Sequence, residues 1–160
     1  MILYVLRHGI AEPRRPGRAE AARALTDEGR AKLSRVLKQA KRSDVKPAVI
    51  LSSPLIRARQ SAEMAAEALG YHSEIVETKS LSPRATVEET WEVVRQYQGQ
   101  PQILVTGHEP HLNNFIAYAL EAPSLRLDLK KGALVCIQID RRAKTPHGVL
   151  EWILTPKTVR

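Results

Sequence analysis

The sequence predicts an α/β fold, a three-layer sandwich in which helices flank a mostly parallel central sheet, with a C-terminal antiparallel hairpin at one edge. Short apolar runs, which are typical of buried parallel strands, alternate along the chain with segments of helical periodicity. This alternation favours right-handed crossovers that place helices on both faces of one sheet. Near the end, two apolar segments flank a turn-prone stretch, which predicts the hairpin.

The strands are expected at the apolar runs. They are ILYVL at residues 2–6, AVIL at 48–51 and ILV at 103–105, with a weaker candidate in HSEIVE around Ile75. The hairpin is expected to consist of ALVCIQID at 133–140 and VLEWIL at 149–154, joined by RRAKTPHG.

Helical patterns occupy the intervals between the strands. Thr26 is expected to cap the first helix, whose apolar side chains recur on one face. The second helix follows Pro54 and stops at Gly70, a residue that favours the left-handed conformation at a helix end. The third contains Trp91 and ends near position 99, and the fourth begins after Pro110.

Length and composition favour a soluble globular protein. The 160 residues suit one compact domain spanning 1–160. No stretch approaches the roughly 20 apolar residues that cross a bilayer, and the apolar run after Met1 is too short for a signal sequence. We therefore expect a cytoplasmic protein with no membrane contact. The single cysteine, Cys136, lies in an apolar strand and is expected to be a core residue.

The net charge of +8 is compatible with an anionic partner or with a solvated basic surface. A phosphorylated protein and a phosphorylated metabolite both fit. Nucleic acid is disfavoured because few aromatic side chains are available for base stacking. The irregular segment 10–24, rich in Pro, Gly and Arg, is expected to arch over the strand ends, although the role of its arginine-rich part, 13–23, and the oligomeric state stay open.

Chemically reactive side chains follow three predicted strands, at the point where each strand ends. They are Arg7 and His8 after the first strand, Ser52, Ser53 and Arg57 after the second, and Thr106, Gly107 and His108 after the later one. Ligands bind beyond the carboxyl ends of parallel strands, so these residues are expected on one rim. Gly9 is expected to let the backbone turn sharply beside the bound group.

Two imidazoles and two guanidiniums on one rim point to phosphoryl transfer. A neutral imidazole is a competent nucleophile toward phosphorus, and two successive displacements are each easier than one. Guanidinium groups present forked donors that match phosphate oxygens. A second imidazole, in its protonated form, adds a further donor to those oxygens.

Four motifs carry a resemblance to a known family. They are RHG at 7–9, LTDEG at 25–29, SSPLIRARQSAE at 52–63 and TGHEP at 106–110. In order and spacing the chain resembles the histidine phosphatase superfamily, the phosphoglycerate mutase-like proteins. Within it the chain looks most like the short SixA-type phosphohistidine phosphatases, and the likeness extends to the terminal hairpin.

The resemblance implies a role for each matching residue. His8 would be the nucleophile that becomes phosphorylated, and Arg7, Arg57 and His108 would bind the phosphoryl oxygens. Arg23 matches a position where related short members also carry arginine, which places it near the phosphate. The implied substrates are phosphorylated proteins, such as histidine phosphotransfer domains, with no cofactor.

Three alternatives stay open at this stage. The first is a small-molecule phosphomonoesterase of the same superfamily, whose general acid would have to be Glu88 or Glu89; those carboxylates are also expected simply to complement a helix dipole. The second is a phosphate-binding module without turnover. The third is a metal site at His108 and His111, which the absence of an accompanying carboxylate or cysteine cluster disfavours.

Overall fold

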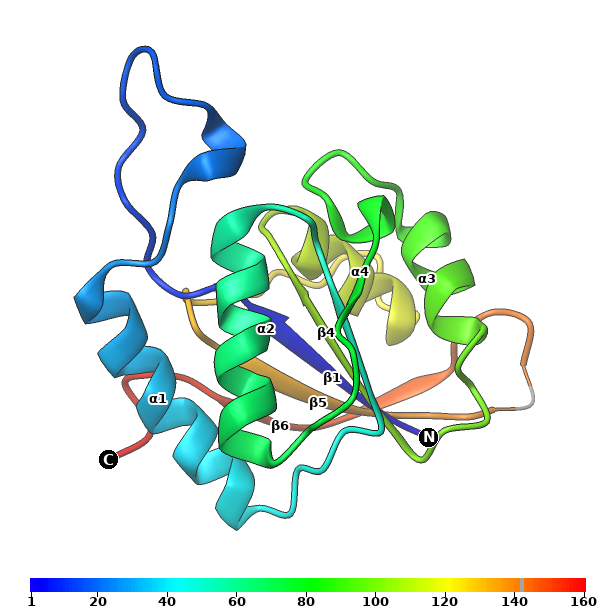
Figure 1. The fold of residues 1–160 in the computed structure, drawn as a ribbon. Coiled ribbons are helices and arrows are strands. Elements are labelled where there is room, and N and C mark those ends of the chain that lie inside the picture. Colours follow the sequence, from blue (N-terminus) through cyan, green and yellow to red (C-terminus); the bar gives the residue numbers. More distant parts are fainter. Residues whose placement is uncertain (142) are drawn as a thin grey trace.

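The computed structural model describes residues 1–141 and 143–160, and its middle layer is a six-stranded sheet in the order β3-β2-β4-β1-β5-β6 (Figure 1). The strands are β1 Ile2–Arg7, β2 Val49–Ser52, β3 Val76–Glu77, β4 Gln102–Gly107, β5 Leu134–Ile139 and β6 Gly148–Leu154. The α-helices are α1 Asp27–Arg42, α2 Ile56–Leu69, α3 Val87–Arg95 and α4 His111–Ala119, with short 3-10 turns at η1 Glu20–Ala22 and η2 Lys79–Leu81.

The sheet is parallel from β3 to β1 and antiparallel beyond. β4 lies between β2 and β1 and is parallel to both. β5 runs antiparallel to β1, and β6 runs antiparallel to β5 at the edge. The predicted fold class is therefore confirmed, including the C-terminal hairpin. The turn predicted between its two strands contains Arg142, which lies outside the described residues.

Alternating side chains of β1 build the two cores of the sandwich. Leu3 and Val5 pack on the face covered by α3 and α4. Tyr4 and Leu6 pack on the opposite face, covered by α1 and α2, where Cys136 is also buried. Both faces of the strand are thus apolar, and the run ends where β1 leaves the cover of the helices.

Local signals in the sequence fix most of the helix ends. The Thr26 hydroxyl accepts a hydrogen bond of 3.0 Å from the Gly29 amide at the start of α1. Gly70 ends α2 in the left-handed conformation, with a φ of 72°. Helix α3 ends at Arg95, slightly earlier than predicted, and hydrogen-bonded turns continue the chain to Gln100.

Gly9 is required for a reason other than the expected sharp turn. Its φ is not positive. A Cβ on Gly9 would lie 3.3 Å from the carbonyl oxygen of Gly29, and one on Gly29 would lie 2.1 Å from that of Ile10. The paired glycines let the first turn of α1 press directly against the chain that leaves β1, which fixes the backbone beside His8.

Among the described residues, no helix combines the length and the apolar character needed to span a bilayer.

Candidate active site

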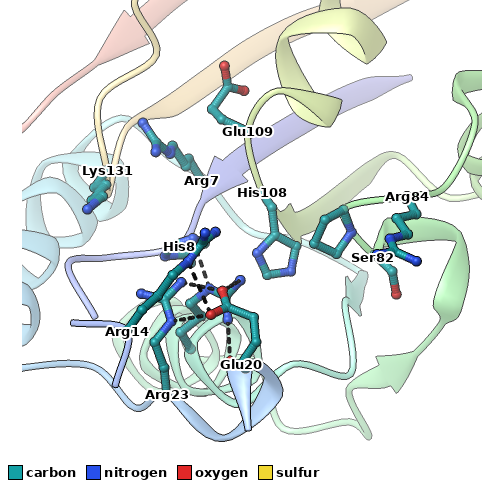
Figure 2. Close-up of a pocket in the computed structure, with 12 residues that line it drawn as sticks. Arg7, His8, Arg14, Glu20, Arg23, Ser82, Arg84, His108, Glu109 and Lys131 are labelled. Carbon is teal, nitrogen blue, oxygen red and sulfur yellow. Dashed lines mark hydrogen bonds and ion pairs between the residues drawn. The ribbon is translucent and has the colours of Figure 1, made fainter. Parts of the chain in front are cut away.

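A hollow of about 620 Å³ lies at the carboxyl ends of β1 and β4 (Figure 2). All five residues that the sequence predicted for the site line it, namely Arg7, His8, Arg23, Arg57 and His108. The other residues lining it are Arg14, Glu20, Ser82, Pro83, Arg84, Glu109 and Lys131. Six cationic side chains therefore face two carboxylates, which makes the hollow suited to an anion.

His8 is buried and held in one tautomer. Its Nδ1 lies 2.7 Å from the carbonyl oxygen of Gly9, which can only accept, so Nδ1 carries the proton. In the neutral ring Nε2 then holds a lone pair. The Nε of Arg57 donates to this Nε2 at 3.3 Å, at the end of the ring that faces the cationic side chains. The lone pair of His8 thus lies on Nε2, where it accepts this bond from Arg57.

His108 lies beside His8, with ring centroids 5.1 Å apart. Its Nε2 is 2.7 Å from the hydroxyl of Ser53, whereas its buried Nδ1 has no partner in the protein. Burial, reinforced by His8 and Arg57, lowers the pKa of His108 to about 2. Burial therefore disfavours the protonated His108 expected from the sequence, and the neighbouring His8 and Arg57 add to this effect. A neutral ring with its proton on Nδ1 still offers one donor to an anion.

Arg7 at the end of β1 and Arg57 at the start of α2 each donate to a backbone carbonyl oxygen. Arg57, in the first turn of α2, is almost fully buried and donates through Nη1 to the carbonyl oxygen of Glu20 at 3.1 Å. Arg7 donates through Nη1 to the carbonyl oxygen of Leu129 at 2.6 Å. The Nε of Arg7 is buried without a partner, so an incoming oxyanion would satisfy it.

Glu20 is a site residue that sequence reasoning missed. Its carboxylate lies 2.5 Å from Nη2 of Arg23 and 3.3 Å from both Nη2 of Arg57 and Nε of Arg14. The hydrogen bond from Arg23 and the nearby guanidiniums lower the pKa of Glu20, so the group is ionised. The carboxylate thus occupies guanidinium donors that a phosphate would use. Nothing in the irregular segment 10–24 signals this contact.

Replacing Glu20 with Gln is expected to strengthen anion binding. Removing one negative charge from the pocket should lower the inhibition constant of inorganic phosphate roughly 3- to 10-fold. Glu12→Gln is the matched control, since Glu12 pairs with Arg18 in the same segment and does not line the pocket. Competitive inhibition assays measure the change, and an unchanged or weaker affinity in the Glu20 variant contradicts the assignment.

Neither expected general acid lies in the pocket. Glu89 completes a capping box with Thr86 at the start of α3, and Glu88 and Glu89 are both exposed and absent from the lining. Their role is to stabilise the helix N-terminus. The second lining carboxylate besides Glu20 is Glu109, whose pKa burial raises. Figure 2 shows the carboxylate of Glu109 pointing away from His108.

His111 lies outside the pocket, where a hydrogen bond to a neighbouring helix holds its ring. Its Nε2 lies 2.7 Å from the hydroxyl of Thr90, and the ring does not line the hollow. Across the part of the chain that the structure describes, no three His, Cys, Asp or Glu side chains gather into a metal-binding group. We expect chelators such as EDTA to leave the rate of phosphate release unchanged. Strong inhibition by a chelator would revive the metal alternative.

The ring of His8 is expected to stay neutral at mildly acidic pH. Burial, with Arg57 and Arg7 adding to it, lowers the pKa of His8 from its ordinary value to about 3. The ring should remain unprotonated from about pH 8 to about pH 5. Because the unfolded chain takes up more protons than the folded protein below about pH 6.5, the free energy of unfolding should decrease as the pH is lowered through this range. Ring-nitrogen NMR measures the ionisation. A titration centred near pH 6 would contradict it.

The fold and the pocket together define a class of protein, the α/β proteins with a cationic, histidine-containing pocket at the carboxyl ends of their parallel strands. The family is also defined. Residues 3–86 match the model of the histidine phosphatase superfamily, branch 1, and the chain belongs to this superfamily. The resemblance found in the four motifs is confirmed.

Three similar proteins illustrate the likeness. A Picosynechococcus sp. protein described as uncharacterized is 32% identical over 139 residues, covering 84% of this chain and 83% of its own. The protein histidine phosphatase SixA, solved in complex with tungstate, superimposes with a TM-score of 0.86 at 22% identity, over 98% of each chain. A phosphoserine phosphatase from Entamoeba histolytica has a TM-score of 0.74 at 16% identity, again over 98% of both chains.

Proposed function

We propose that the protein is a metal-independent phosphatase that hydrolyses phosphohistidine on proteins through a covalent phosphohistidine on His8. In the first step the Nε2 lone pair of His8 attacks phosphorus, and the bond from phosphorus to the substrate nitrogen breaks. The electron pair leaves with that nitrogen. In the second step water attacks the phosphorus of phospho-His8, which releases inorganic phosphate, and His8 is restored as a neutral ring.

One observation carries the proposal, the hydrogen bond between Nδ1 of His8 and the carbonyl oxygen of Gly9. It leaves Nε2 unprotonated without the help of a separate base, and the low pKa of the ring keeps it so. A module that only binds phosphate needs the guanidiniums but has no use for this lone pair. The arrangement therefore favours turnover over binding alone.

The remaining groups would act on the phosphoryl oxygens. Arg57 and Arg7 supply guanidinium donors, His108 supplies Nδ1–H, and Arg23 adds charge once the anion competes with Glu20. Such donors stabilise the charge that the phosphoryl group carries in the transition state.

The substrate class follows from the carboxylates of the pocket. Glu20 is ionised and engaged by arginines. Burial raises the pKa of Glu109, which favours a proton donor, but its carboxylate points away from His108, which disfavours proton transfer to an alkoxide beside the two histidines. A phosphoramidate nitrogen can take up its own proton before it leaves. The pocket is therefore better suited to a phosphorus–nitrogen bond than to a phosphomonoester.

A direct comparison of substrates tests this proposal. A histidine phosphotransfer domain, phosphorylated on its histidine, is assayed beside phosphoserine and p-nitrophenyl phosphate under the same conditions. We expect kcat/KM for the phosphohistidine protein to exceed that for either ester by about 100-fold or more. A higher kcat/KM for the esters would identify a small-molecule phosphomonoesterase instead.

A further inference from the structure

A second basic hollow lies directly beside the pocket. Its volume is about 520 Å³, and it is lined by Arg7, Ile10, Lys32, Arg35, Asp128, Lys130, Lys131, Pro156 and Lys157, which we call the basic basin. Six cationic side chains there face one carboxylate, that of Asp128, which is itself paired with Lys130. The family motifs of the sequence do not account for this surface.

The basin and the pocket are continuous. Arg7 and Lys131 line both hollows. Figure 2 shows Lys131 and the guanidinium of Arg7 on the same side of the pocket, next to each other. A substrate whose phosphoryl group reaches His8 would therefore extend its neighbouring groups over the basin.

The loop that carries Lys130 and Lys131 is hydrogen-bonded to the end of β1, far from it in the sequence. Gly132, in the left-handed conformation, donates its amide to the carbonyl oxygens of Arg7 at 3.1 Å and His8 at 3.0 Å. This anchors the loop that carries Lys130 and Lys131 to the end of β1. Pro156 lies against Gly132, in a turn closed by the bond of 3.1 Å from the Thr158 amide to the Thr155 carbonyl.

Three cations of the basin form no direct ion pair with a carboxylate of the described residues. Among the described residues, Arg35, Lys131 and Lys157 form no ion pair, whereas Lys32 is paired with Glu28. The side chains of Arg35, Lys131 and Lys157 are all exposed. Six cations around the single carboxylate of Asp128 repel one another, and an anionic ligand relieves that repulsion.

The kind of cation indicates the kind of ligand. Five of the six cations that line the pocket are arginines, which grip a phosphate with paired donors, but four of the six cations of the basin are lysines. Lysine is a mobile point charge that attracts anions without fixing their geometry, which suits charges spread over a surface more than one tightly held phosphate. The half-buried Ile10 and Pro156 add a small apolar contact in the middle of the basin. This combination resembles the rim of a protein interface rather than a second phosphate site.

We propose that the basic basin docks an acidic patch of the phosphoprotein, next to its phosphohistidine, and so selects protein substrates. The inference rests on the proposed function. Docking would lower KM for substrates with Asp or Glu beside the phosphorylated histidine. It would leave the chemistry at His8 unchanged, because Arg35, Lys157 and Lys32 do not line the pocket.

Two phosphohistidine peptides test the proposal, one flanked by four aspartates and the other by four serines. For the parent protein we expect KM to be at least about 10-fold lower for the acidic peptide. In the double variant Arg35→Glu, Lys157→Glu the preference should fall to less than about twofold. The rate on free phosphohistidine should stay within about twofold of the parent.

The matched control is the double variant Lys38→Glu, Lys41→Glu. It changes the net charge by the same amount, but both residues lie on α1 outside the basin. It should retain the preference for the acidic peptide. Equal KM values for both peptides in the parent protein, or an equal loss in the control, would overturn the docking site. A lower KM for a small bisphosphate than for the acidic peptide would also overturn the docking site.

Failure of the proposed function gives a different result. In that case neither phosphohistidine peptide is hydrolysed, while esters are. Binding of the unphosphorylated acidic peptide to the parent and to the basin variant, followed by calorimetry, still tests the basin. Weaker binding in the basin variant alone supports docking, and equal binding in both overturns it.

Discussion

His8→Ala is expected to abolish turnover, with kcat reduced by at least ~10³-fold. No neighbouring group can replace the lost nucleophile. The Nε2 of His108 is engaged with the hydroxyl of Ser53, and the remaining lining side chains are cations, carboxylates, a proline and Ser82. Initial rates on a phosphohistidine protein measure the loss.

The same variant should keep its fold. His8 lies at the end of β1, beyond the apolar residues of either core. Circular dichroism and thermal unfolding should show a folded protein, and His72→Ala, on the exposed surface, should be fully active. A His8 variant that turns over at the parent rate would remove the nucleophile assignment.

Arg57→Lys is expected to lower kcat/KM about 100-fold. Arg57 uses three nitrogens at once. Its Nε faces His8, and Nη1 and Nη2 contact the carbonyl oxygen and the carboxylate of Glu20. A lysine ammonium keeps the charge but reaches only one of these positions, so the forked contact with two phosphoryl oxygens is lost.

Arg59→Lys is the matched control for this change. Arg59 lies two residues further along α2 and pairs with Glu63 and Glu77 on the outer surface. It keeps its charge in the variant and does not line the pocket, so kcat/KM should stay within about twofold. Equal losses in the two variants would show that Arg57 acts through the stability of α2 rather than on the substrate.

The fold could be predicted from the sequence because its signals are local. The apolar runs of β1 and β4 are buried on both faces, and Thr26 and Gly70 mark helix ends by their own chemistry. The sequence signal for strand β3 is weak, and the strand is only two residues long, Val76–Glu77. The third helix ended earlier than predicted because the last residues before Gly99 form turns.

The strand-end residues of the candidate site could also be predicted, for a topological reason. Parallel strands bring their carboxyl ends to one edge, so His8 and His108 had to lie close together once β1 and β4 were neighbours. Glu20 and Lys131 could not be predicted in this way. They come from irregular segments, whose positions depend on tertiary hydrogen bonds such as that of Gly132 with β1. The neutral state of His108 likewise depends on burial, which the sequence does not display.

The central claim is that a phosphoryl group passes through His8, and trapping the intermediate tests it most directly. The protein is mixed briefly with a radiolabelled phosphohistidine protein, quenched by denaturation, and digested for mass spectrometry. We expect a label on the peptide that contains His8. This label should be labile in acid and stable in alkali, as a phosphoramidate is, and it should be absent from His8→Ala. An acid-stable label, or a label on another residue, would contradict it.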